Sequence, residues 1–162
     1  MEFKTEVEEE ELDKIADTYT ETLEEISKFF QIGDVEINEY EGDEGELILD
    51  LEGDNMSPLI GRHGNTILSL QKMVTLISSN KLGYKFPVTI DICGYRAKQK
   101  DKLEDYAFKM ANRALSQSRK INLRPMSPYD RRIVHMALSE EKSVETFSEG
   151  AGRNRHVVIN PL

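Results

Sequence analysis

Residues 57–67 have the sequence SPLIGRHGNTI, in which two glycines separate a short apolar segment from a longer one. Ser57 and Pro58 favour the start of a short helix, as its N-cap and its first helical residue. Gly61 and Gly64 interrupt the helical pattern, because glycine adopts backbone angles that other residues avoid and lets another chain come close. A second helix begins at the same bend, and its free N–H groups favour a phosphate there. The stretch therefore predicts two helices joined by an exposed, glycine-containing turn.

Apolar periodicity on both sides of this bend predicts a unit of mixed helices and strands. A helix of about five turns is expected from Leu12 to about Phe30, because apolar residues recur there at helical spacing. Leu47, Leu49 and Leu51 alternate with polar residues, which is typical of a half-buried strand. The other predicted elements are a strand at 35–40, a turn at 41–45, helices at 57–60 and after residue 64, and a strand at 86–92. Together these elements predict the order α-β-β-α-α-β.

The second half of the chain predicts a smaller unit with the order α-β-α-β-β. Its elements are expected at 95–118, 121–123, 127–139, 144–147 and 155–159. Ser127, Pro128 and Asp130 indicate the start of the middle helix, with a capping side chain, a proline at the first position and an acid three residues after the cap. The fold class predicted for the whole chain is α+β, with a first domain at 12–93 and a second at 94–162.

Charge is divided unevenly along the chain. The net charge of −9 combines 21 acidic and 3 basic residues in 1–54 with 9 acidic and 18 basic residues in 55–162. This division has two open interpretations: a basic body that binds nucleic acid next to an acidic arm, or a solvated acidic face with no binding role. Residues 1–11 include a run of four glutamates. We expect them to form a disordered acidic arm, because like charges repel and little apolar surface is available there.

Composition argues against several functional classes. No apolar run approaches the roughly 18–20 residues of a membrane span, and the N-terminus lacks the basic-then-apolar order of a secretory signal, so we expect a cytoplasmic location without membrane insertion. The single cysteine, Cys93, excludes internal disulfides and a cysteine-rich zinc site. The three histidines, His63, His135 and His156, lack metal-ligand spacing, and no hydroxyl residue near them has the context of a nucleophile. We therefore expect neither catalysis nor a cofactor or metal.

Two cationic side chains lie between the glycines of the bend. Arg62 can pair with a phosphate through its planar guanidinium group, and His63 is a smaller, pH-dependent donor. A lone G-x-x-G more often marks a plain helix-turn-helix than a binding loop. Its position between the last two helices of an α-β-β-α-α-β unit, however, resembles the KH domain in its bacterial (type II) topology. That resemblance implies an RNA-binding loop that clamps the backbone of about four nucleotides, formed by Gly61, Arg62, His63, Gly64 and Asn65.

A second candidate site lies on the helix predicted at 127–139. Arg131 and His135 are four positions apart, so they lie about 40° apart on one face, and we expect both to be exposed and to reach one target together. Arg132 projects sideways from this pair, and Arg124 lies just before the helix. The open alternative is a solvated helix face on which His135 caps a local group.

The sequence around this pair resembles the R-three-H domain, which is named for an Arg and a His separated by three residues and binds single-stranded nucleic acid. The match covers the second predicted unit in both motif and order. It implies that Arg131 and His135 contact the nucleic acid, and that Arg153 and Arg155 on a neighbouring strand add positive potential. Tyr129, the aromatic residue nearest the pair, is expected to belong to the core rather than to stack on bases.

A KH unit followed directly by an R-three-H unit resembles the bacterial Jag family, also called KhpB or EloR. The resemblance implies an RNA-binding, post-transcriptional regulator linked to cell elongation, division or sporulation. Its partner would be single-stranded RNA, with single-stranded DNA left open. The alternative is a protein-interaction adaptor or dimerisation module that uses the KH surface, as a homodimer or with a small single-KH protein, and binds nucleic acid only secondarily. Family members often carry a further N-terminal domain before an acidic linker, and this chain begins near such an acidic segment.

Overall fold

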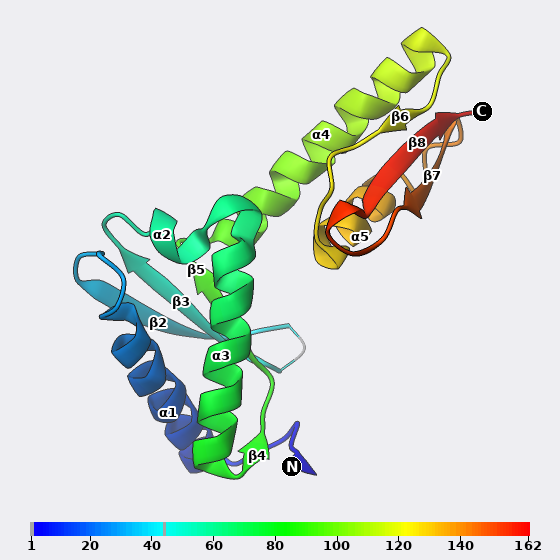
Figure 1. Cartoon of the computed structure of the whole chain (residues 1–162). Coiled ribbons are helices and arrows are strands. Elements are labelled where there is room, and N and C mark those ends of the chain that lie inside the picture. Colours follow the sequence, from blue (N-terminus) through cyan, green and yellow to red (C-terminus); the bar gives the residue numbers. More distant parts are fainter. Residues whose placement is uncertain (1, 44) are drawn as a thin grey trace. The chain divides into compact units, whose positions relative to one another are not determined.

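The chain divides into two compact units between Tyr95 and Arg96 in the computed structural model, which describes residues 2–43 and 45–162 (Figure 1). Each unit has its own three-stranded sheet and its own hydrophobic core. Within these described residues, no helix combines the length and the apolar character needed to cross a membrane.

A three-stranded sheet forms the framework of the first unit. Its strands, in spatial order, are β2 (Val35–Glu41), β3 (Leu47–Gly53) and β5 (Val88–Ile92). β2 and β3 pair antiparallel, whereas β3 and β5 pair parallel with Leu49 opposite Ile90. Because side chains alternate along a strand, buried Leu, Val and Ile side chains form one whole face of β3 and β5. The turn predicted at 41–45 includes Glu44, which lies outside the described residues.

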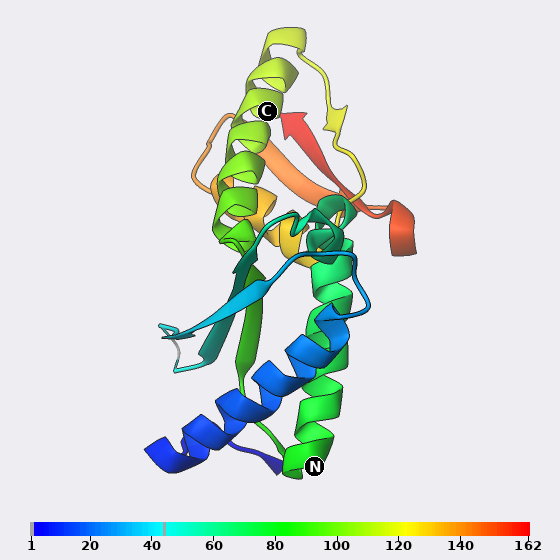
Figure 2. The ribbon, with the colours of Figure 1, turned by 90° about the vertical axis from the view of Figure 1, so that its left-hand side faces the viewer.

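Two long helices cover that apolar face, α1 (Glu9–Ser27) and α3 (Asn65–Leu82), as Figure 2 shows. Each helix contributes a buried stripe at helical spacing: Ile15, Tyr19 and Leu23 from α1, and Ile67, Leu70 and Val74 from α3. The short helix α2 (Ser57–Ile60) precedes α3, and Met56 rather than Ser57 occupies its N-cap position. The α-β-β-α-α-β order and the α+β class predicted from the sequence are confirmed.

Gln71 of α3 binds the open edge of this sheet. β5 is an edge strand, and Gln71 Nε2 donates a hydrogen bond of 2.8 Å to the carbonyl oxygen of Val88. The backbone N–H of Ile90 donates in turn to Gln71 Oε1 at 2.7 Å. One side chain thus satisfies two backbone groups of an edge strand, where groups without partners are costly or prone to pair with other chains. The same contacts fix α3 against the sheet.

The N-terminal residues differ from the disordered arm expected at 1–11. β1 (Glu2–Phe3) pairs in parallel with β4 (Tyr84–Lys85), and α1 begins within the expected arm. Lys4 Nζ lies 2.6 Å from Glu11 Oε1 and 4.3 Å from the centroid of the Tyr84 ring. One cation therefore links the N-terminal strand to α1 and offsets the glutamate repulsion on which the expectation rested.

The second unit contains an antiparallel sheet and two helices. Its strands, in spatial order, are β6 (Ile121–Asn122), β8 (His156–Pro161) and β7 (Val144–Glu149). α4 (Tyr95–Gln117) and α5 (Pro128–Ala137) pack with this sheet around a separate core. Ser127 caps α5 as predicted, because its hydroxyl accepts the N–H of Asp130 at 3.1 Å. The predicted order α-β-α-β-β is confirmed.

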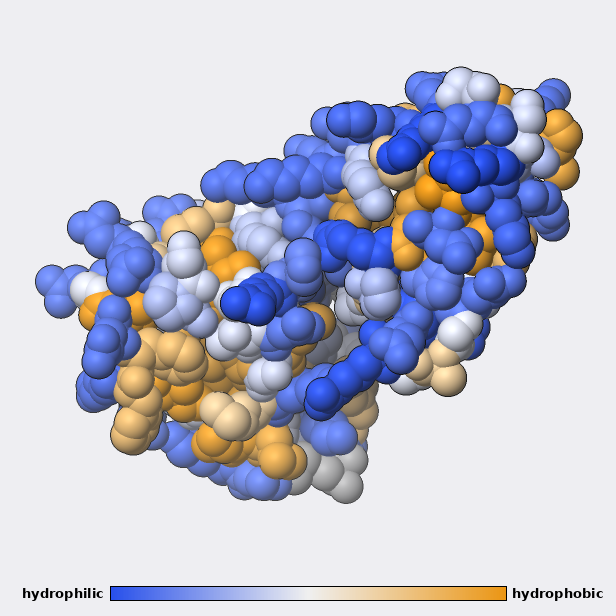
Figure 3. Space-filling view, turned by 45° about the horizontal axis from the view of Figure 1, so that its top comes forward, coloured by the Kyte–Doolittle hydropathy of each residue, from blue (hydrophilic) through white to orange (hydrophobic). Residues whose placement is uncertain are grey.

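Some large apolar side chains of the second unit remain exposed. On the face drawn in Figure 3, hydrophobic residues reach the surface between hydrophilic ones. Tyr129 is 49% exposed and Met136 is 64% exposed. The expectation that Tyr129 belongs to the core is therefore wrong, because Asp130, Ile133 and Val134 occupy the buried face of α5.

Candidate nucleic-acid interface

The glycine bend has an unusual backbone. α2 ends at Ile60, residues 62–64 form a single 3-10 turn, and α3 begins immediately after that turn. Gly61, His63 and Gly64 have φ angles of 73°, 54° and 74°. His63 carries a Cβ atom, so its left-handed conformation costs on the order of 1 kcal/mol or more. Backbone strain of this kind is concentrated at ligand-binding sites, where surrounding structure maintains it.

Neighbouring side chains pack so closely against the bend that only glycine fits at its two ends. A methyl group on Gly61 would overlap Thr66 Oγ1 and lie 2.7 Å from Thr66 Cβ. A methyl group on Gly64 would lie 2.9 Å from Cε1 of Tyr95. The first residue of α4 and the first turn of α3 therefore fix the bend from the protein side.

The side chains between and after the glycines are exposed, as the sequence predicted. Arg62, His63 and Asn65 are all exposed, whereas Gly64 is buried. No side chain caps the N-terminus of the 18-residue helix α3, although the N–H of its first residue, Asn65, donates to the carbonyl oxygen of Arg62. The positive end of the helix dipole at this position favours an anion. Among the described residues, Arg62 takes part in no salt bridge. A guanidinium group, the N-terminus of a long helix and a fixed main chain thus meet at one exposed bend, a combination that is suited to a phosphate.

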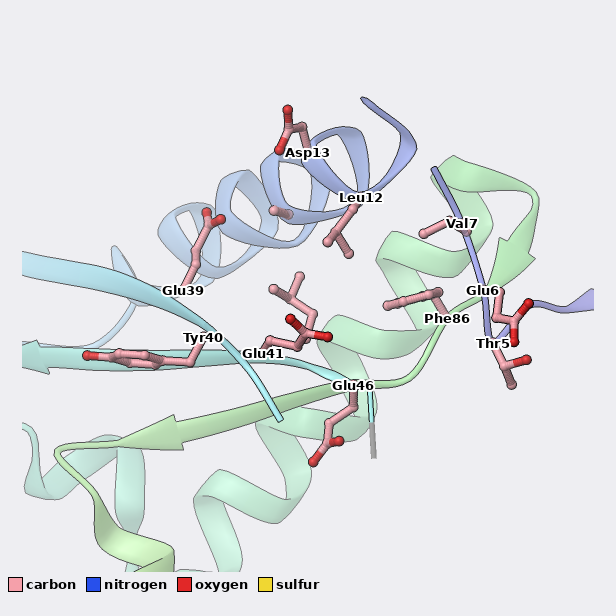
Figure 4. Close-up of a pocket in the computed structure, with 13 residues that line it drawn as sticks. Thr5, Glu6, Val7, Leu12, Asp13, Glu39, Tyr40, Glu41, Glu46 and Phe86 are labelled. Carbon is pink, nitrogen blue, oxygen red and sulfur yellow. The ribbon is translucent and has the colours of Figure 1, made fainter. Parts of the chain in front are cut away.

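Acidic side chains gather at the other end of β3. A groove of about 460 Å³ lies between the N-terminal segment, α1 and the ends of β2 and β3 that adjoin their connecting turn (Figure 4). Its apolar residues include Leu12 and Phe86, and its acidic residues are Glu6, Asp13, Glu39, Glu41 and Glu46. The groove adjoins the first residue of β3, whereas the chain reaches the glycine bend through α2, after the last residue of β3. Carboxylates repel phosphate, so the groove is unsuited to a nucleic-acid backbone.

Arg131 and His135 share one face of α5, as predicted, but both are half-buried rather than fully exposed. Arg131 Nη1 donates a hydrogen bond of 3.2 Å to Ser148 Oγ. His135 Nε2 lies 3.0 Å from the same oxygen, and His135 Nδ1 lies 2.8 Å from Thr146 Oγ1. The expectation of free side chains fails because β7 runs beside this face of α5 and presents hydroxyls at alternate positions. We call these four residues the Arg/His cluster.

His135 acts in the Arg/His cluster through its hydrogen bonds rather than through a charge. Burial, and secondarily the charge of Arg131, lower the pKa of His135 below its ordinary value. The ring is therefore neutral near pH 7, with one nitrogen donating and the other accepting. Both nitrogens are within hydrogen-bond distance of hydroxyls on β7. Arg131 supplies the positive charge, and among the described residues its Nη2 has no hydrogen-bond partner.

The remaining predicted cations lie on different parts of the second unit. Arg153 and Arg155 are exposed in and after the turn that joins β7 to β8, and Arg155 Nη1 donates to the carbonyl oxygen of Gly150 at 3.2 Å. Arg124 is half-buried before α5. Arg132 is exposed and lines a groove between α4 and α5. The structure brings Arg131 and His135 together through β7 but leaves Arg132 on another side of the helix.

Sequence reasoning missed the two hydroxyl residues of the Arg/His cluster. Thr146 and Ser148 lie two positions apart on β7, immediately before a Glu-Gly turn. Their period of two on a predicted strand was the available signal, because it places both side chains on one face. The signal did not identify their partners, since the contacts join residues 11, 13 and 17 positions apart.

Comparison with known protein families assigns a domain to each unit. The KH domain of KhpA and KhpB matches residues 20–90, and the R-three-H domain matches residues 101–161. Both domains were expected from the motifs, and in this order.

Curated relatives carry the same assignment. The chain is 39% identical over 122 residues to the RNA-binding protein KhpB of Clostridium symbiosum, an alignment that covers 75% of this chain and 55% of the relative. It is 35% identical over 112 residues to the RNA-binding protein KhpB of Bacillus subtilis (strain 168), covering 68% and 54%. The chain thus spans about half the length of these relatives. With a KhpA/KhpB-type KH domain followed by an R-three-H domain, the chain belongs to the Jag/KhpB family.

Proposed function

We propose that the chain binds single-stranded RNA through the Gly61–Gly64 bend of the KH unit and the Arg/His cluster of the R-three-H unit. The observation that carries the proposal is the glycine bend itself. It combines a strained, fixed main chain, an uncapped helix N-terminus and an arginine without a salt bridge among the described residues. The relatives named as RNA-binding proteins add support from outside the structure.

The bend is suited to a flexible backbone rather than to a duplex. Glycines at both ends allow a sugar–phosphate chain to approach the main chain, while Arg62 pairs with a phosphate. A single strand can bend into such a site and turn its bases out of the stack, whereas the bases of a duplex remain stacked and paired. The bend therefore favours single strands, and a contact to the 2′-hydroxyl is what would distinguish RNA from DNA.

The Arg/His cluster is a weaker second contact in this proposal. Arg131 carries the charge, and the neutral His135 ring holds Ser148 and Thr146 in place beside it. Two modest sites on one chain raise the apparent affinity, because binding at the first increases the effective concentration of RNA at the second. A cytoplasmic location, a post-transcriptional regulatory role and a function without catalysis stay predictions within this proposal.

Salt dependence tests the proposal directly. We expect labelled single-stranded RNA to bind, measured by fluorescence anisotropy, with an affinity that falls as salt rises. Three to five phosphate contacts predict a slope of about −2 to −4 in a plot of log association constant against log salt. Double-stranded RNA of the same length serves as the control and should bind more weakly. Equal binding of the duplex, or no binding of single strands at about 0.1 M salt, contradicts the proposal.

A protein-interaction role is the alternative, and one observation favours it. Met73 and Leu76 on α3 are 49% and 62% exposed and form an apolar stretch that the KH core does not use. Exposed apolar side chains of this kind occur at protein interfaces. Sedimentation at about 0.5 M salt separates the two roles. Self-association that persists there, together with lost RNA binding, supports an interface on α3, and Leu76→Lys should abolish it.

A further inference from the structure

A groove between α4 and α5 combines an exposed aromatic ring with cationic side chains. It has a volume of about 450 Å³, and its principal residues are Lys100 and Glu104 of α4 and Tyr129, Arg132, Ile133 and Met136 of α5. The α5 residues recur at helical spacing, on a different side of the helix from Arg131 and His135. The groove is thus separate from the Arg/His cluster, although both lie in the R-three-H unit.

The composition of the groove matches a site for an unstacked base. Proteins bind single strands by stacking bases on exposed aromatic rings and pairing the backbone with nearby cations. Tyr129 is half exposed, Met136 adds a polarisable apolar surface beside it, and the mostly buried Ile133 supports both from below. Arg132 is exposed, and among the described residues its charge takes part in no salt bridge. The volume falls within the usual range for small-ligand sites.

One acidic residue indicates which part of a nucleotide the groove accepts. Glu104 lines the groove, and its Oε1 lies 3.9 Å from Lys100 Nζ. A carboxylate repels phosphate, but it accepts hydrogen bonds from the N–H groups at the edge of a base. The base therefore fits beside Glu104 and on Tyr129, and the neighbouring phosphate fits at the exposed Arg132.

We propose that this groove binds one nucleobase of single-stranded RNA, stacked on Tyr129, with the adjoining phosphate paired to Arg132. The inference rests on the proposed RNA binding and adds a base-binding subsite to it. Apolar contact with a protein segment is the other use of such a groove. Arg132 favours the nucleotide, because among the described residues its charge takes part in no salt bridge and an apolar segment would offer it no partner.

The sequence permits a direct optical test, because the chain contains no tryptophan. In Tyr129→Trp, the single tryptophan reports on the groove, and base stacking should quench its fluorescence on addition of an RNA oligonucleotide. The same oligonucleotide with abasic sites should leave the fluorescence nearly unchanged. Quenching of equal size by the abasic strand would show contact with the backbone instead of a base, and would overturn the inference.

Affinity measurements separate the contribution of base stacking on Tyr129 from the contribution of the charge on Arg132. Tyr129→Ala should weaken RNA binding roughly 5- to 100-fold without changing the salt slope, whereas Tyr129→Phe should bind as the unchanged chain does. Arg132→Ala should lower the magnitude of the salt slope by about 0.7, the value for one phosphate contact on a single strand. Tyr40→Ala is the matched control, because Tyr40 is 52% exposed but lines the acidic groove of the KH unit.

The outcomes distinguish this inference from the proposed function. If the unchanged chain binds no RNA, the proposed function fails and the subsite fails with it. If the unchanged chain binds RNA, but Tyr129→Ala binds equally well and Tyr129→Trp shows no quenching, only the subsite is refuted. Circular dichroism of each variant identifies misfolding, and Tyr129→Trp and Tyr129→Phe keep the test valid if the alanine variant unfolds.

Discussion

Reversing the charge at the glycine bend is the sharpest perturbation that the structure offers. In Arg62→Asp/His63→Asp, both changed side chains are exposed and neither contributes to the core, so the KH unit should fold normally. Loss of a charged hydrogen bond to phosphate costs about 1.5–3 kcal/mol. A carboxylate placed about 5 Å from a phosphate adds roughly 1–2 kcal/mol of repulsion at an effective dielectric constant of 40–80. The total predicts RNA binding that is weaker by about 100-fold or more.

The assay is fluorescence anisotropy of a labelled single-stranded RNA at fixed salt, with thermal unfolding followed by circular dichroism to verify the fold. Lys14→Asp is the matched control, because Lys14 is exposed on α1 and the substitution introduces a similar charge in the acidic part of the chain. We expect the control to change the affinity less than about threefold, through long-range electrostatics alone. If the double variant and the control bind RNA with the same affinity, the bend is not the binding site and the reasoning from its geometry is refuted.

Three further predictions concern the rest of the molecule. Arg131→Ala/His135→Ala should weaken RNA binding by about 1–3 kcal/mol in the same anisotropy assay, because a charged contact and the hydrogen bonds around it are lost. Burial and Arg131 lower the pKa of His135, so the unfolded chain takes up a proton near pH 6.5 before the folded chain does. The thermal unfolding midpoint should therefore fall as the pH drops from about 7.5 to about 5.5, and His135→Gln should reduce that fall. Gln71→Leu should lower the free energy of unfolding by about 2 kcal/mol in urea titrations, because two backbone groups of β5 lose their partner; an unchanged midpoint would show that water replaces the side chain fully.

Long periodic segments made most of the fold predictable from the sequence. The alternation of Leu47, Leu49 and Leu51 fixed both the strand and its buried face, and the helical stripes predicted the packed sides of α1 and α3. The β1–β4 pair was not predictable in the same way. Each of these strands has two residues, which is too short for a period. The contact between Lys4 and Glu11 that accompanies their pairing lies within a segment that is otherwise rich in like charges.

The sequence predicts the part of the candidate site that depends on the local backbone, which is the glycine bend. It does not predict the part that depends on packing between α5 and β7. Gly61 and Gly64 are identifiable from the sequence because their conformational role belongs to the residues themselves. The half-buried state of Arg131 and His135 is set by where β7 lies, and helical spacing alone contains no information about that strand. Tyr129 shows the same limit, since an aromatic residue near a helix start is as compatible with a core as with an exposed groove.

If the chain binds RNA as proposed, the distribution of charge predicts different parts for the two units. Residues 1–95 hold 22 acidic and 7 basic residues, whereas residues 96–162 hold 8 acidic and 14 basic residues. The KH unit has a net charge of −15 and repels a polyanion that has not yet made contact with it. The R-three-H unit has a net charge of +6 and attracts the polyanion. Glu41 and Glu46 of the groove in Figure 4 lie at the start of β3, whereas the bend comes after its other end. The seven residues of β3 span about 23 Å, which is more than a screening length of about 8 Å. In the proposed function the bend holds a phosphate despite the acidity of its unit, and the positive charge of the second unit helps to bring the strand to the chain. Attraction by the second unit and clamping by the first are thus complementary, and removing positive charge from the second unit should slow association at both sites.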